Sequence, residues 1–153
     1  MIAEGQAAPD FTLQDQDGNS VSLSGLKGTP IVLYFYPKDD TPGCTTEACA
    51  FRDARADYES AGAVVLGVSP DDVKSHRKFA DKFSLPFPLL ADPDHAVCDA
   101  YGVWKEKNMY GRKYFGVERT TFLIDRDGTI ARIFPKVKVK GHSDVVLEAV
   151  KEV

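Results

Sequence analysis

The sequence has few cysteines and no long apolar run. Its 153 residues include three cysteines, Cys44, Cys49 and Cys98. The longest uninterrupted apolar run, Ile31 to Tyr36, is far shorter than the roughly 18 residues of a membrane span. The opening segment, MIAEGQAAPDF, lacks the basic and apolar regions of a signal peptide. We therefore expect a cytoplasmic protein with no membrane partner, in a compartment where structural disulfides are rare.

An excess of positive charge is also absent. The net charge of −4 argues against nucleic acid or anionic lipid as the main partner. Within the basic cluster, Lys136, Lys138 and Lys140 alternate with valines. This alternation favours an edge strand whose lysines face water over a binding patch.

The histidines form no recognisable ligand set. His76, His95 and His142 are scattered along the chain, and we expect all three at the surface. The sequence therefore predicts neither a metal site nor an organic cofactor.

Hydrophobic periodicity predicts one α/β domain over residues 1–153, with a mixed central sheet flanked by helices and preceded by a β-hairpin. The hairpin is expected from strands at 11–13 and 20–23, because the turn residues Asp-Gly lie between them. The further elements expected are strands at 30–37, 63–70 and 85–90, a strand pair within 119–134, and helices at 42–60, 71–83, 95–101 and from 143 onward.

The segment TPGCTTEACA holds two of the three cysteines. Cys44 follows Pro42 and Gly43, which places it in the first turn of the predicted helix. A helix N-terminus favours the thiolate form of a cysteine through its unpaired N–H groups and its dipole. The preceding strand ends at Pro37, so this turn is expected at the carboxyl end of the sheet, where α/β proteins usually place their sites.

The spacing between Cys44 and Cys49 does not suit a static disulfide. Residues five apart in an intact helix have Cα atoms roughly 8.5 to 9 Å apart, whereas a disulfide needs about 4.4 to 6.8 Å. The two sulfurs would meet only after local unwinding of the helix. From spacing alone, a redox pair, two inert core cysteines and a structural zinc site all remain open, although CxxC-type exchange is excluded.

A resemblance to a known family narrows these choices. Pro37, Thr41 and Cys44 in PKDDTPGC match the Pro-x-x-x-Thr-x-x-Cys signature of peroxiredoxins. The longer stretch YPKDDTPGCTTEACAFRD resembles the bacterioferritin-comigratory-protein, or peroxiredoxin Q, subfamily. This resemblance continues through FPLLADPDHAVCDAYGVW and GVERTTFLIDRDG and covers most of the chain.

The resemblance implies a thioredoxin-like fold and the reduction of hydroperoxides at a peroxidatic Cys44. Cys49 matches the resolving cysteine of one subset of the subfamily, which implies an internal disulfide reduced by thioredoxin or a similar dithiol donor. In another subset the resolving cysteine lies in the next helix, but residues 71–83 contain none. The subfamily is often monomeric, and we expect a monomer.

The resemblance also implies supporting roles for four residues. Thr41 would hydrogen-bond the thiolate or the peroxide, and Pro37 would shield the site. Arg119 would stabilise the thiolate and polarise the peroxide, while Glu47 would orient Arg119. Without the family, Arg119 is more typical of a surface ion pair and Thr41 of a turn.

Residues outside the motif are expected to be structural. The neighbours of Cys98, Val97 and Tyr101, indicate helix packing. Trp104 and Phe115 are interpreted as core residues rather than as the border of a binding surface.

Two other classes of function remain beside a metal-free thiol peroxidase. One is a non-enzymatic redox sensor or chaperone that uses the same disulfide switch, and the other is a metal-binding module. Continuous consumption of peroxide in the presence of a reductant separates the enzyme from the sensor.

Overall fold

Strand β3 (Ile31–Phe35) forms the centre of the sheet. All five of its residues are buried, as expected for a continuous run of β-branched and aromatic side chains. It pairs in parallel with β4 (Val64–Ser69) and antiparallel with β8 (Thr120–Ile124). This arrangement comes from a computed structural model, which describes residues 2–153.

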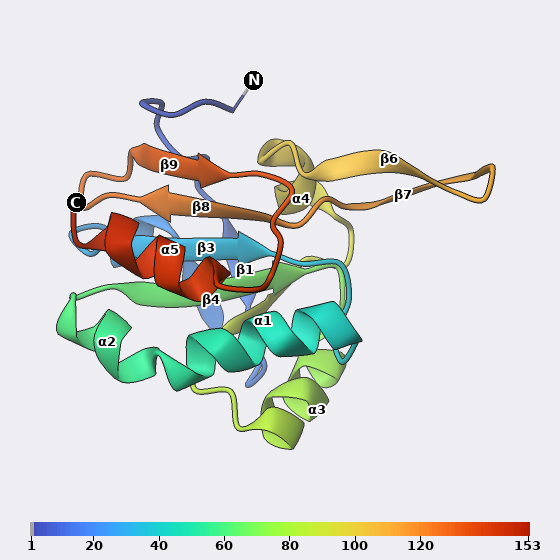
Figure 1. Cartoon of the computed structure of the whole chain (residues 1–153), viewed down its shortest axis with the longest axis horizontal. Coiled ribbons are helices and arrows are strands. Elements are labelled where there is room, and N and C mark those ends of the chain that lie inside the picture. Colours follow the sequence, from blue (N-terminus) through green and yellow to red (C-terminus); the bar gives the residue numbers. More distant parts are fainter. Residues whose placement is uncertain (1) are drawn as a thin grey trace.

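The remaining strands extend this sheet on both sides. The order is β2-β1-β5-β4-β3-β8-β9, with parallel and antiparallel neighbours. The predicted mixed sheet and its N-terminal hairpin are therefore confirmed (Figure 1). The bounds of the other strands are β1 (Thr12–Gln14), β2 (Ser20–Ser22), β5 (Leu89–Ala91) and β9 (Ile130–Phe134).

The sheet separates two hydrophobic clusters. Alternate side chains of β3, and of Tyr36 just after it, point to opposite faces of the sheet. Val32, Tyr34 and Tyr36 therefore belong to one cluster, and Ile31, Leu33 and Phe35 belong to the other. Each fully buried side chain of this size contributes about 1.5–3 kcal/mol of hydrophobic stabilisation. The first cluster includes residues from α1 (Pro42–Asp53), α2 (Arg55–Ser60), α3 (Val73–Phe83) and α5 (His142–Val150). The second includes residues from α4 (Ala96–Ala100), and Leu26 of the 3-10 helix η1 (Ser24–Leu26) packs against it.

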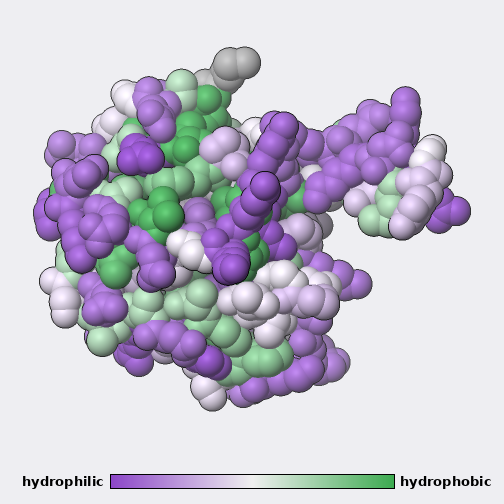
Figure 2. Space-filling model, in the orientation of Figure 1, coloured by the Kyte–Doolittle hydropathy of each residue, from purple (hydrophilic) through white to green (hydrophobic). Residues whose placement is uncertain are grey.

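A second, two-stranded sheet was not predicted. Strands β6 (Trp104–Met109) and β7 (Arg112–Val117) form a hairpin that projects from the body, and its surface is largely hydrophilic (Figures 1 and 2). Tyr110 and Gly111 make its two-residue turn, both with positive φ angles of 54° and 79°. Phe115 is 59% exposed, so the interpretation of this residue as core is wrong.

Two expectations about strands need correction. The lysine-rich stretch 136–140 forms no strand, because β9 ends at Phe134 and Lys136 has a φ of 49°, which breaks an extended run. The strand expected at 85–90 begins only at Leu89. Pro86 and Pro88 lack the N–H that a ladder requires, so pairing starts after them.

The expectation of three surface histidines is wrong for two of them. His76 is 0% exposed and His142 is 8% exposed. His95 is partly exposed, and its ring stacks on that of Trp104 with 4.1 Å between the centroids. Both rings have hydrogen-bond partners in the interior, which makes their burial possible. His76 contacts Asp39 and the Leu90 carbonyl, and His142 Nε2 lies 2.8 Å from Thr121 Oγ1.

None of the helices among residues 2–153 combines the length and the apolar character needed to cross a membrane.

Candidate active site

Cys44 lies where the sheet meets the first helix. Strand β3 continues into residues 36–41, here called the reactive loop, and α1 begins at Pro42. Thr41 is the N-cap, with an extended backbone, so Cys44 is the third helical residue. Its side chain is buried, and the N–H groups of the first helical turn have no acceptor within the helix. The predicted position at a helix N-terminus is confirmed.

Strand pairing brings Arg119 to Cys44. Phe35 at the end of β3 pairs with Thr120 at the start of β8, so the residue before Thr120 lies beside the reactive loop. Arg119 donates one hydrogen bond from Nη2 to Cys44 Sγ at 3.2 Å and another from Nη1 to Glu47 Oε1 at 2.6 Å. A guanidinium aimed at the sulfur stabilises the thiolate form of the cysteine.

Gly43 makes room for this contact. A Cβ atom built on Gly43 would lie 3.2 Å from Arg119 Nη2, closer than ordinary van der Waals contact. The missing side chain therefore lets the guanidinium approach the sulfur from over the helix terminus.

Glu47 accepts a hydrogen bond from Nη1, the second terminal nitrogen of the Arg119 guanidinium. It is 1% exposed and one helical turn after Cys44, on the same side of α1. Burial raises the pKa of Glu47 to about 7, and the opposing effect of Arg119 is smaller. Oε2 of this carboxyl group makes no hydrogen bond with any residue among 2–153.

Thr41 and Pro37 shape the reactive loop. The Thr41 hydroxyl donates to the carbonyl of Lys38 at 2.8 Å, which leaves its oxygen lone pairs able to accept a hydrogen bond. The contact to the sulfur that the resemblance suggested for this hydroxyl is not formed. Pro37 lies two residues after the end of β3 and is half-buried.

The three cysteines have different surroundings. Cys44 and Cys49 both lie within α1, which is continuous over residues 42–53, and all three thiols are free. Cys49 is half-buried. Cys98 is 0% exposed in the second hydrophobic cluster, and burial raises the pKa of its thiol well above the usual range. Its predicted packing role is confirmed.

Sequence reasoning missed a second cation near the site. Burial and the nearby charge of Arg119 lower the pKa of Lys107 on β6. Glu118 and Cys44 raise this pKa, but by less. The hairpin that carries Lys107 had not been recognised, so no signal connected this residue to Cys44.

A group of possible metal ligands lies beside the reactive loop. Asp39, Asp71 and His76 each offer one possible ligand atom, and these three atoms lie within 4.8 Å of one another. Both ring nitrogens of His76 are already hydrogen-bonded, to Asp39 and to the Leu90 carbonyl. The group is therefore a closed hydrogen-bonded cluster, in which a metal would have to displace existing bonds.

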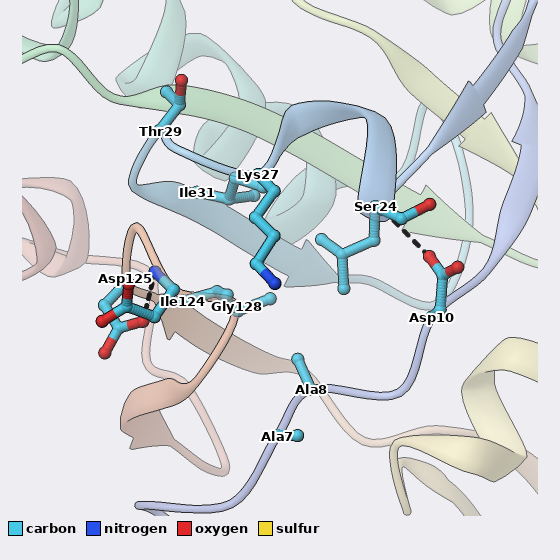
Figure 3. Close-up of a pocket in the computed structure, with 12 residues that line it drawn as sticks. Ala7, Ala8, Asp10, Ser24, Lys27, Thr29, Ile31, Ile124, Asp125 and Gly128 are labelled. Carbon is cyan, nitrogen blue, oxygen red and sulfur yellow. Dashed lines mark hydrogen bonds between the residues drawn. The ribbon is translucent and has the colours of Figure 1, made fainter.

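The hollow shown in Figure 3 is separate from this site. It lies near Ile31 and Ile124, which pair at the far end of β3 and β8, and Lys27 extends across it. Cys44 and Arg119 lie at the opposite end of the same strands.

Comparisons with known proteins agree with this geometry. A profile of the AhpC/TSA family matches residues 4–133. A putative peroxiredoxin bcp of Coxiella burnetii is 57% identical over 141 residues, which cover 92% of this chain and 93% of the relative. The structure of a PrxQ mutant from Xylella fastidiosa has a TM-score of 0.94 and 39% identity, with 99% of this chain and 97% of that chain covered.

A further solved structure is that of the Xanthomonas campestris bacterioferritin comigratory protein, described by its alkyl peroxide reduction activity. It has a TM-score of 0.89 and 46% identity, and covers 93% of this chain and 90% of that chain. These similarities confirm the thioredoxin-like fold expected for the family. The chain therefore belongs to the AhpC/TSA family, as a peroxiredoxin of the Bcp/PrxQ type.

Proposed function

We propose that this thiol peroxidase uses Cys44 as the peroxidatic cysteine and Cys49 as the resolving cysteine. Peroxidase activity follows from membership of the family. The single observation that supports Cys44 is its buried sulfur at a helix N-terminus, 3.2 Å from the guanidinium of Arg119. Neither Cys49 nor Cys98 has a cation bonded to its sulfur among the described residues.

The first step oxidises Cys44. Its thiolate attacks the terminal oxygen of a hydroperoxide, an S–O bond forms, and the O–O bond breaks. The departing oxygen leaves as water or an alcohol after it takes a proton, and the cysteine becomes a sulfenic acid. Arg119 donates hydrogen bonds where negative charge develops, and the Thr41 oxygen accepts one from the peroxide O–H group.

The second step joins the two cysteines. The thiolate of Cys49 attacks the sulfenic sulfur, the S–S bond forms as the S–O bond breaks, and the hydroxide that leaves takes a proton to become water. Because both residues lie on a continuous helix, the turns between them unwind before the disulfide closes. A dithiol donor such as thioredoxin then reduces the disulfide. The relative from Xanthomonas campestris supports organic hydroperoxides as substrates beside hydrogen peroxide.

Substitution of each cysteine tests these roles. Cys44→Ser should abolish peroxide consumption, whereas Cys49→Ser should still form the sulfenic acid but no internal disulfide. Cys98→Ala is the matched control and should turn over normally, because its thiol is buried away from the site. Peptide mapping by mass spectrometry identifies the bridge. A Cys44–Cys98 disulfide would exclude Cys49 as the resolver.

Steady-state turnover distinguishes the enzyme from a redox sensor. With a thioredoxin system present, we expect many equivalents of peroxide consumed per protein, and a single stoichiometric oxidation would support the sensor. The monomeric state and the cytoplasmic location stay predictions, which gel filtration and cell fractionation would check.

A further inference from the structure

A buried carboxylate fixes the reactive loop from within. Asp39 lies five residues before Cys44, and its side chain is 4% exposed. Its Oδ1 accepts from the Tyr36 hydroxyl at 2.5 Å. Its Oδ2 accepts from the Ser75 hydroxyl at 2.8 Å and bonds His76 Nδ1 at 2.7 Å. One side chain of the reactive loop and two of α3 therefore converge on this one carboxyl group.

The partner His76 is bonded at both ring nitrogens. Nδ1 faces the carboxylate of Asp39, and Nε2 lies 2.9 Å from the Leu90 carbonyl. Both of these neighbours offer oxygen lone pairs, so an N–H group on each ring nitrogen would satisfy both contacts. With His76 0% exposed and the Asp39 side chain 4% exposed, the two residues form a hydrogen-bonded pair inside the protein.

Other contacts tie the same stretch of loop to the region around α3. The Asp39 N–H donates to Asp71 Oδ2 at 2.8 Å, and that oxygen also accepts from Ser69. Asp40, with a φ of 55°, pairs with Lys82 at 2.8 Å. The loop is thus attached to α3 and to the segment before it at several points, all upstream of Cys44.

We propose that the Asp39–His76 pair is a positioning device that fixes the upstream boundary of the segment that unwinds. The proposal rests on the proposed Cys44–Cys49 cycle. During that cycle the first turns of α1 open while Asp39 stays bound to α3. The helix then rewinds from a fixed point and returns Cys44 to Arg119. His76 touches neither sulfur and acts through the loop.

Loss of the pair should shift the balance between the wound and unwound forms. Without His76, the buried Asp39 carboxyl group would lack one hydrogen-bond partner. Its free energy would then be lower if it moved toward water. The loop would move with it, and the wound helix would lose its fixed start. Reaction with peroxide needs the wound form, and disulfide closure needs the unwound form, so the two rates should change in opposite directions.

Hydrogen exchange of the reduced protein tests the anchor without reference to activity. In His76→Gln, amides in the first turns of α1, from Thr45 to Cys49, should exchange about tenfold faster or more, the factor expected for loss of a charge-assisted hydrogen bond. Tyr58→Phe is the matched control. It removes a buried hydrogen bond of 2.7 Å to the Ser143 carbonyl, away from the loop, and should leave these amides unchanged.

Rapid kinetics provide the second readout. His76→Gln should lower the second-order rate constant for peroxide severalfold and raise the first-order rate constant for disulfide closure severalfold. Ser75→Ala, which removes one bond to Asp39 and is less disruptive if His76→Gln folds poorly, should change both rates in the same directions by about twofold to threefold. Equal slowing of both steps would indicate general damage and overturn the proposal.

Ring nitrogen NMR tests the charge of the pair. Both nitrogens of His76 should carry hydrogens in the wild-type protein at neutral pH. In Asp39→Asn, the amide can donate to Nδ1, so that nitrogen should lose its hydrogen while Nε2 keeps the bond to Leu90. A bare ring nitrogen in the wild type, or unchanged exchange in His76→Gln, would refute the anchor. Absence of the Cys44–Cys49 disulfide would refute the proposed function and leave the exchange result standing.

Discussion

At the scale of single residues, the site depends on the forked shape of one guanidinium. Arg119 bonds a sulfur with one nitrogen and a carboxyl oxygen with another, which fixes the plane of the group at both ends. A lysine has a single nitrogen and could not hold Cys44 and Glu47 in the same way. Glu47 therefore makes the contact with Arg119 that its proposed orienting role requires.

Gly43→Ala should separate catalysis from folding. The new Cβ would lie 3.2 Å from Arg119 Nη2 and push the guanidinium away from Cys44. We expect the rate constant for peroxide to fall about tenfold, as for one weakened charge-assisted hydrogen bond. The melting temperature should be unchanged or slightly higher, because alanine is a better helix former. Stopped-flow kinetics and circular dichroism measure the two effects, and full activity in the folded variant would contradict the role of Gly43.

At the scale of elements, the strands of the seven-stranded sheet were predictable to within a few residues, because their apolar runs are local. The helix start at Pro42 was equally clear from its turn residues. The β6–β7 hairpin escaped prediction because both of its faces are largely exposed, so no apolar alternation marks it. Its only turn signal was Gly111.

The burial of His76 could not be predicted from its neighbours in sequence. Its partner Asp39 lies 37 residues away, and nothing near His76 in the sequence indicates that contact. Local pattern singled out only Cys44, through its place at a predicted helix start. The roles of Thr41, Pro37, Arg119 and Glu47 all required the family, and the contact between Arg119 and Glu47 spans 72 residues of sequence.

The hairpin should be dispensable for folding. Lys107 and Tyr114 are paired in the register, so residues 108–113 can be replaced by an Asn-Gly turn between them. These residues are mostly exposed and belong to neither hydrophobic cluster. We expect the free energy of unfolding to change by less than about 0.5 kcal/mol in urea denaturation. A loss of several times this value would show that the hairpin supports the body.

At the scale of the whole molecule, two buried groups link stability to pH in opposite ways. The pKa of Glu47 is raised to about 7, so the folded state holds a proton that the unfolded state releases above about 4.5. The pKa of His142 is lowered to about 4 by burial first and by Arg119 second, so the folded state excludes a proton that the unfolded state binds below its usual value of 6.5.

Glu47→Gln should therefore become more stable relative to the wild type as pH rises from 4.5 to 7. The shift of the Glu47 pKa sets the upper limit for this increase in the free energy of unfolding, at most about 3 kcal/mol. His142→Gln should show the opposite trend. It should become more stable relative to the wild type as pH falls from 6.5 toward 4. Urea denaturation at several pH values measures both differences. Parallel pH profiles for Glu47→Gln and the wild type would show that Glu47 is not the group responsible.

The division of the interior into two clusters affects what oxidation does to the protein. Cys44, Ala48 and Phe51 all belong to the cluster on the α1 side, so a bridge to Cys49 disturbs that half. The other half, built on Leu33 and Phe35, contains no residue of α1. Oxidised and reduced forms should therefore keep one common rigid half. In the proposed cycle, each round of turnover would then rearrange only the α1 side of the molecule, while the packing on the other side stays unchanged.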